Sequence, residues 1–156
     1  MNCRCNVCDF TVEDFKISGL AAPANKLSKD MGGFRETIDS GAFYDVLETN
    51  PSVIATIDHS REVEKVLGST ESGTLQLTAT ESGLQFTLDV ANTSTGADVI
   101  ELIKRGDINK MSFAFVVDQD TWTPIGREMI RTIHSFETLT DISIVVNPAY
   151  EETKVS

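Results

Sequence analysis

The chain has 156 residues, a length that suits one domain of ordinary size. Hydrophobic residues make up 40% and charged residues 24%, which is enough for a packed core and excludes wholesale disorder. The balance of 13 basic and 24 acidic residues gives a net charge of -11, which argues against nucleic acids and anionic membranes as partners. No apolar run reaches the roughly 20 residues that a membrane-spanning helix needs, and no signal segment opens the chain, so we expect a soluble, unexported protein.

The three cysteines, Cys3, Cys5 and Cys8, all lie in the first eight residues. An odd number at one terminus does not make a disulfide framework. The spacing could hold a soft metal, but a closed zinc site usually needs four ligands, and both histidines lie far away in the sequence. We therefore expect residues 1–9 to form a reduced, partly mobile tail without a metal, and residues 10–156 to form a single domain.

The first part of the chain predicts short strands separated by turns, with one short helix. The helix is indicated by Phe43, Val46 and Leu47, which repeat at the spacing of an amphipathic helix behind Asp39 and Ser40 as candidate N-caps. In chain order, the expected elements are a strand at 10–18, a loop at 20–33, a strand at 34–38, the helix at 41–49 and an apolar strand at 52–57.

Two similar segments follow, ESGTLQLTAT at 71–80 and ESGLQFTLDV at 81–90. Apolar and polar residues alternate in both, and turn residues at 81–83 join them, so they predict an antiparallel hairpin with one buried face. The clearest helix is expected at 96–105, with Thr95 and Asp98 as a capping pair and Gly106 as the C-terminal stop.

Three further strands are expected at 110–117, 128–136 and 139–146. In the first of them, Met111, Phe113 and Phe115 would point to one face, and Ser112 and Ala114 to the other. Strands outnumber helices and mostly follow one another directly. The sequence therefore predicts an α+β fold, with a closed or nearly closed, mostly antiparallel β-barrel core flanked by a few helices.

Chemistry could reside in a few polar residues at or inside these strands. His59 follows an apolar strand, where rigid scaffolds often present reactive groups. Ser112 lies in a very apolar strand, so it must hydrogen-bond or face a cleft, unless it is simply a tolerated small residue. Asp141 interrupts another apolar strand and would share a face with Leu139 and Ser143.

Together, Ser112, His59 and Asp141 offer a nucleophile, a base and a group that orients the base. The simpler interpretation is that both histidines, His59 and His134, are structural or exposed and have no catalytic role. A third interpretation is a metal-dependent hydrolase that uses both histidines with acidic groups, but no H-x-x-x-H or H-E-x-x-H spacing supports it.

Four blocks of the sequence, taken in order, resemble one protein family. They are GGFRETIDSGAF at 32–43, IDHS at 57–60, MSFAF at 111–115 and LTDISIVVNPAY at 139–150. This ordered set resembles the prohead (procapsid maturation) serine proteases of tailed bacteriophages, which are related to the herpesvirus assemblin proteases. The resemblance runs from about residue 17 to residue 150. It implies a herpesvirus-protease-like β-barrel with surrounding helices. It also implies that residues 10–156 are a protease domain, a serine endopeptidase that needs no cofactor.

Carried over by position, the resemblance implies that His59 is the general base and Ser112 the nucleophile. Asp141 occupies the place of the third catalytic residue. In the herpesvirus relatives a second histidine takes that place, so His134 is a rival, although it lies seven residues too early. The family commonly has Asn where this chain has Asp58, whose carboxylate would raise the basicity of the histidine if it lies close.

The resemblance also places the oxyanion hole near the end of the last strand, around Val146 and Asn147. It implies cleavage of the scaffolding protein or of the scaffold domain of the major capsid protein, with the portal protein as a further candidate substrate. Cleavage, including self-cleavage, would occur inside the assembling procapsid in the host cytoplasm. The herpesvirus relatives work as dimers, so a homodimer is one option.

The alternative function is a non-enzymatic β-barrel module for phage assembly. It predicts no contact between His59 and Ser112, and an exposed strand edge or surface patch instead.

Overall fold

The structure is a computed structural model that describes residues 1–146. Ten strands and two α-helices lie in this part of the chain, in agreement with the predicted α+β class. The strands are β1 (Asn2–Val7), β2 (Thr11–Glu13), β3 (Lys16–Pro23), β4 (Arg35–Ile38), β5 (Ile54–Ile57), β6 (Gly68–Ser69), β7 (Leu75–Thr80), β8 (Gly83–Asp89), β9 (Lys110–Ile125) and β10 (Glu128–Val145). The helices are α1 (Ser40–Glu48) and α2 (Ser94–Arg105), with a 3₁₀ turn, η1, at Val63–Lys65.

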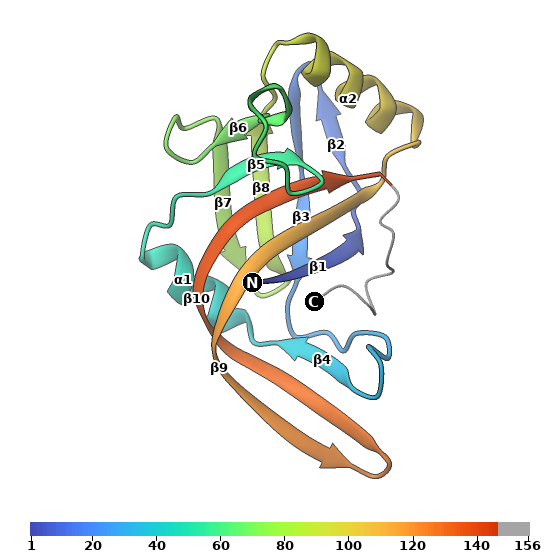
Figure 1. The fold of residues 1–156 in the computed structure, drawn as a ribbon, viewed down its shortest axis with the longest axis vertical. Coiled ribbons are helices and arrows are strands. Elements are labelled where there is room, and N and C mark those ends of the chain that lie inside the picture. Colours follow the sequence, from blue (N-terminus) through green and yellow to red (C-terminus); the bar gives the residue numbers. More distant parts are fainter. Residues whose placement is uncertain (147–156) are drawn as a thin grey trace.

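The strands form two sheets (Figure 1). The larger has the order β1-β9-β10-β5-β6, with β4 also paired to β10, and the smaller has the order β2-β3-β8-β7. Within residues 1–146 no strand pairs across from one sheet to the other, so the sheets do not close into a barrel. The barrel and the herpesvirus-protease-like architecture are therefore not confirmed.

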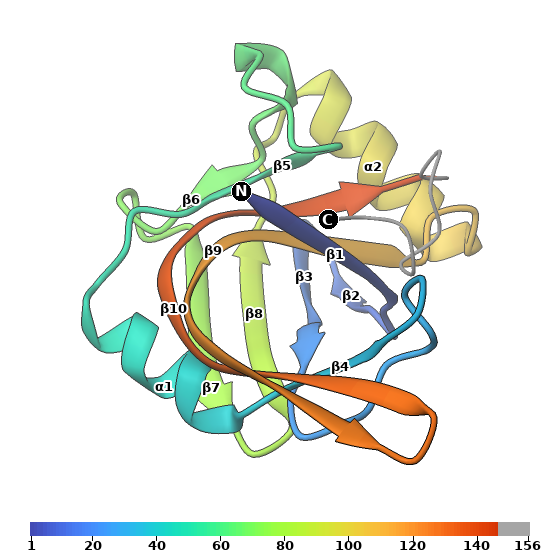
Figure 2. The ribbon, with the colours of Figure 1, turned by 60° about the horizontal axis from the view of Figure 1, so that its bottom comes forward.

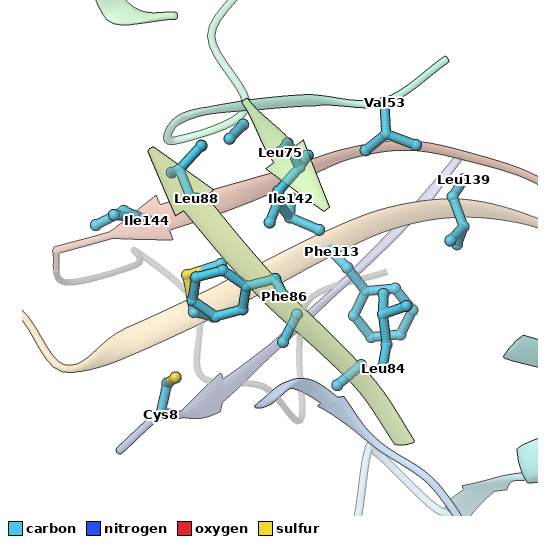
Figure 3. Packing of buried hydrophobic residues seen from close by; sticks show 14 of the residues in the cluster. Cys8, Val53, Leu75, Leu84, Phe86, Leu88, Phe113, Leu139, Ile142 and Ile144 are labelled. Atoms are coloured by element: carbon cyan, nitrogen blue, oxygen red, sulfur yellow. The ribbon is translucent and has the colours of Figure 1, made fainter. Parts of the chain in front are cut away.

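One hydrophobic core fills the space between the two sheets (Figure 3). Leu84, Phe86 and Leu88 of β8 lie in it with Phe113 of β9 and Ile142 of β10. The alternation of the sequence predicted this face of both the β7–β8 hairpin and β9, because successive strand residues point to opposite faces. Burying these side chains supplies most of the favourable free energy of folding.

The two helices begin and end close to their predicted positions. In α2, Gly106 adopts the left-handed conformation with φ of 85° and ends the helix as expected. The N-cap, however, is Thr93, whose side chain accepts a hydrogen bond from Gly96 N; the predicted pair of Thr95 and Asp98 lies inside the helix. Neither helix is long and apolar enough to cross a membrane, as far as the described residues go.

The N-terminal residues are part of the larger sheet instead of the predicted tail. Strand β1 pairs antiparallel with β9, and Cys5 and Cys8 are buried. Arg4 anchors the strand from its other face, because its guanidinium binds both carboxylate oxygens of Glu36 at 2.7 and 3.0 Å. The segment is short, and its pairing partner lies more than a hundred positions further along the sequence, so no neighbouring residues indicated that this strand would be paired.

Several other boundaries differ from the prediction. The single strand expected at 10–18 is two strands, β2 and β3, which pair antiparallel across a turn at Asp14 and Phe15. Strand β3 runs to Pro23, into the segment expected as a loop, because it pairs with β8 along its length. Strand β9 continues to Ile125, and β10 is one strand where two were expected. Register shifts absorb the irregular positions of β10 without ending it. The C-terminal half of β9 and the N-terminal half of β10 project from the rest of the molecule as a long hairpin (Figures 1 and 2).

Candidate active site

Ser112 lies near the start of β9, between two neighbouring strands. It is opposite Cys5 of β1 on one side and Ser143 of β10 on the other. Its neighbours Met111 and Phe113 point into the core, so the Ser112 side chain projects from the other face of the sheet, as the alternation predicted. It is nevertheless buried.

His59 follows β5 in a tight turn. Strand β5 runs parallel to β10, and the chain then reverses through Asp58 and His59, both with positive φ, at 50° and 59°. Ser60 N donates to Ile57 O at 2.9 Å, closing the turn. Two consecutive positive φ values with this hydrogen bond are the features of a type I′ turn. Asp and Asn tolerate this conformation best among residues other than glycine, which explains an acidic residue at 58.

Asp141 reaches the same face as Ser112 because β10 contains a bulge. Leu139 is opposite Phe115 and Asp141 is opposite Ala114, so Thr140 is an extra residue in β10. Leu139 therefore points into the core and Asp141 to the opposite face. The prediction that these two residues share a face is wrong, since strict alternation does not hold across a bulge.

The His59 ring bridges the other two side chains. Its Nδ1 lies 2.5 Å from Asp141 Oδ1, and its Nε2 lies 2.8 Å from Ser112 Oγ. The imidazole is 24% exposed and the Asp141 carboxylate only 1%. With its proton on Nδ1, bonded to the carboxylate, the neutral ring presents a lone pair on Nε2 to the serine hydroxyl. This arrangement can remove the hydroxyl proton as the oxygen attacks an electrophile.

Two further residues contact Asp141 and were not singled out as functional by the sequence. Ser143 Oγ donates to Asp141 Oδ1 at 2.9 Å, and the Arg61 guanidinium lies 3.7 Å from Oδ2. The signal for Ser143 was its position two residues after Asp141 on the same strand. Arg61 lies in a loop, where no periodicity relates it to the strand.

His134, the rival third residue, lies at a different place. Its Nδ1 is 2.6 Å from Asp39 Oδ2 and its Nε2 is 2.9 Å from Thr121 Oγ1, at the base of the projecting hairpin. The two histidines thus have separate sets of partners. Among residues 1–146, no group of three or more His, Cys, Asp or Glu side chains gathers as a metal site.

Asp58 is exposed, and no hydrogen bond between its carboxylate and His59 is present. Of the two residues implied for the oxyanion hole, Val146 is about half exposed, and Asn147 lies outside the described residues.

The cysteines do not converge on a common point. Cys3 and Cys5 face the side of the sheet that carries Ser112, while Cys8 belongs to the core. Burial, and after it the charge of Asp141, raises the pKa of Cys3, and burial raises the pKa of Cys8 to about 11. All three lie within the described part of the chain, and none forms a disulfide.

Comparison with known proteins gives one result. The family model of the caudovirus prohead serine proteases matches residues 5–156, essentially the whole chain. The chain belongs to this family. No curated protein and no solved structure matches the chain significantly.

Members of the prohead serine protease family mature the capsids of tailed bacteriophages, and they act inside the procapsid on its proteins. A hydroxyl, an imidazole and a carboxylate joined by hydrogen bonds form the constellation that many serine proteases use, on several unrelated folds. The family match thus gives a chemical context for the hydrogen bonds of Ser112, His59 and Asp141.

Proposed function

We propose that the chain is a serine endopeptidase of prohead maturation in which Ser112, His59 and Asp141 are the catalytic residues. The observation that carries the proposal is the continuous chain of hydrogen bonds from Asp141 through His59 to Ser112, on a buried sheet face. The order of the three groups matches the order in which the reaction needs them.

The mechanism is acyl transfer. His59 Nε2 takes the Ser112 proton as Oγ attacks a peptide carbonyl, giving a tetrahedral intermediate and an imidazolium. The imidazolium returns that proton to the leaving amine, and the acyl group stays on Ser112. Water then attacks the acyl-enzyme with the help of the same base and releases the second product. Asp141 keeps the ring in the required tautomer and stabilises its positive charge.

The substrates proposed are proteins of the assembling shell: the scaffolding protein, the scaffold domain of the major capsid protein, and the portal protein. Self-cleavage is proposed as well. The family's place of action inside the procapsid supports this choice, because these are the proteins enclosed with the enzyme. The chain would meet them in the host cytoplasm as the shell assembles.

The proposal is tested by co-expression of the chain with the scaffolding and capsid proteins of its phage, followed by intact-mass spectrometry. Wild type should yield discrete truncation products, and Ser112→Ala should yield none, because the attacking oxygen is gone. Ser135→Ala is the matched control. It removes a hydroxyl from β10 that bonds to Asp118 on the projecting hairpin, so cleavage should continue.

Cleavage that persists in Ser112→Ala would remove this serine from the mechanism. An absence of cleavage in wild type would favour the assembly module instead. That alternative predicts that Ser112 and His59 are unrelated, and the 2.8 Å contact between them argues against it.

A further inference from the structure

Ser143 is a fully buried polar residue that the mechanism above does not use. It lies on β10, opposite Ser112 of β9 on one side and opposite Thr56 of β5 on the other. A hydroxyl without exposure to water must find its partners within the protein. Those partners are two members of the proposed catalytic set.

The Ser143 hydroxyl donates one hydrogen bond and accepts another. It donates to Asp141 Oδ1 at 2.9 Å and accepts from the backbone N–H of His59 at 2.9 Å. The His59 ring nitrogen Nδ1 is also 3.2 Å from Ser143 Oγ, but Asp141 lies closer to it, at 2.5 Å. A hydroxyl has one proton to donate, and here Asp141 receives it.

The hydrogen bond that Ser143 accepts comes from a residue whose backbone conformation is strained. His59 has a φ of 59°, in the left-handed region that β-carbons disfavour. Its own N–H is held by Ser143 Oγ, whereas the N–H of Asp58 is held by Ile144 O. Thr56 Oγ1 fixes the far end of the turn by donating to Ser60 O at 2.8 Å.

We propose that Ser143 is a positioning residue of the active site, and this inference rests on the proposed function. Through one hydroxyl it sets both the orientation of the Asp141 carboxylate and the backbone from which the His59 ring projects. The Asp141 carboxylate on β10 and the His59 ring in the turn after β5 are thereby held in a fixed position relative to each other. Reactions of this kind are sensitive to displacements of about 1 Å, so the loss of such a tie should lower the rate of the chemical step.

The experiment measures the rate at which a fluorophosphonate probe phosphonylates Ser112 in the full chain. The probe forms an O–P bond and releases fluoride, and His59 accepts the serine proton, so no peptide substrate is needed. Ser143→Ala should label about 10- to 100-fold more slowly than wild type. Ser143→Thr, which keeps the hydroxyl, should recover most of the rate, and Ser135→Ala on the same strand should label as wild type does.

Measuring the effect of Ser143→Ala in the Asp141→Asn variant separates a positioning role of Ser143 from a general loss of structure. If Ser143 acts through Asp141, Ser143→Ala should cost much less when Asp141→Asn is already present, since coupled residues are not additive. A wild-type rate in Ser143→Ala, or a full and additive loss in the double variant, would overturn the inference while leaving the proposed function intact.

A spectroscopic readout covers the case in which Ser143→Thr does not fold or the wild type does not react with the probe. In the proton NMR spectrum, the His59 Nδ1–H bonded to Asp141 should give a downfield resonance. Ser143→Ala should shift or broaden it, and Ser135→Ala should not. An unchanged resonance would contradict the role of Ser143, whereas an unreactive wild type would contradict the proposed function.

Discussion

The two histidines of the chain are held by similar partners in different surroundings. His59 lies between Asp141 and Ser112, and its contacts are 2.5 and 2.8 Å long. His134 lies between Asp39 and Thr121, and its contacts are 2.6 and 2.9 Å long. In both, the carboxylate meets Nδ1 and the hydroxyl meets Nε2, so distances and atom types alone do not distinguish a site of chemistry from a surface contact.

Burial and further support distinguish them. The Asp141 side chain is 1% exposed and receives a second hydrogen bond from Ser143, whereas the Asp39 side chain is 48% exposed. Water competes for Asp39 and screens its charge, so its contact contributes little free energy. The carboxylate of Asp141 is held away from water, where its interaction with an imidazolium is much stronger. We therefore expect chemistry at His59 only.

The largest effect should come from replacing each histidine in turn. His59→Gln removes the base and should lower kcat/KM for scaffold cleavage by about 10⁴-fold or more. His134→Gln should change it by less than about twofold, because only an exposed contact is lost. Both are measured by the rate of product formation on purified scaffolding protein. Comparable losses in the two variants would show that burial does not separate the roles of His59 and His134.

A smaller effect is expected at the two carboxylates. Asp141→Asn favours the wrong imidazole tautomer and should lower kcat by up to about 10⁴-fold, the size of the effect known for a triad carboxylate. Some activity above that of Ser112→Ala should remain if Asp141 only orients the base. Asp39→Asn serves as the matched change and should leave kcat unaltered. An Asp141→Asn enzyme with full kcat would exclude this residue as the orienting group.

The smallest effect is expected at Cys8, which lies away from both histidines and tests what burial alone does to a titratable side chain. Burial raises the pKa of Cys8 from its ordinary value of 9.0 to about 11. Above pH 9 the unfolded chain loses this proton while the folded chain keeps it, so the contribution to stability is complete below pH 9 and is lost toward pH 11.

Chemical denaturation, repeated at intervals of about one pH unit between pH 8 and pH 11, measures this contribution. It is the difference between the free energies of unfolding of wild type and Cys8→Ala at each pH. The free energy of unfolding should fall more steeply with pH in wild type than in the variant. Parallel curves for the two proteins would show that the thiol is as well solvated in the fold as in the unfolded chain.

Local patterns of the sequence were enough to predict several elements. The alternation in 71–90 predicted the β7–β8 hairpin, and the apolar stripe with Gly106 predicted α2. These patterns work because periodicity and caps depend on neighbouring residues only. The motif blocks also named His59, Ser112 and Asp141 as candidates, and the structure brings their side chains into contact.

Other features depend on residues far apart in the sequence. Strand β1 forms because it pairs with the edge of β9, more than a hundred positions further along, and no local pattern of the sequence indicates a pairing over that separation. The bulge at Thr140 reverses the face expected for Leu139 relative to Asp141, and register of that kind is decided between strands. No local signal indicated that the Asp58–His59 turn would fold back over β10.

The sequence by itself therefore determined the α+β class, the main core faces and the residue types that serine protease chemistry needs. Only the tertiary structure decided which carboxylate meets which histidine, and that Ser143 joins Asp141 to the His59 backbone. The physical reason is that hydrogen bonds between distant residues depend on strand register, bulges and turn conformation together. These become fixed only when the strands pair and the core packs.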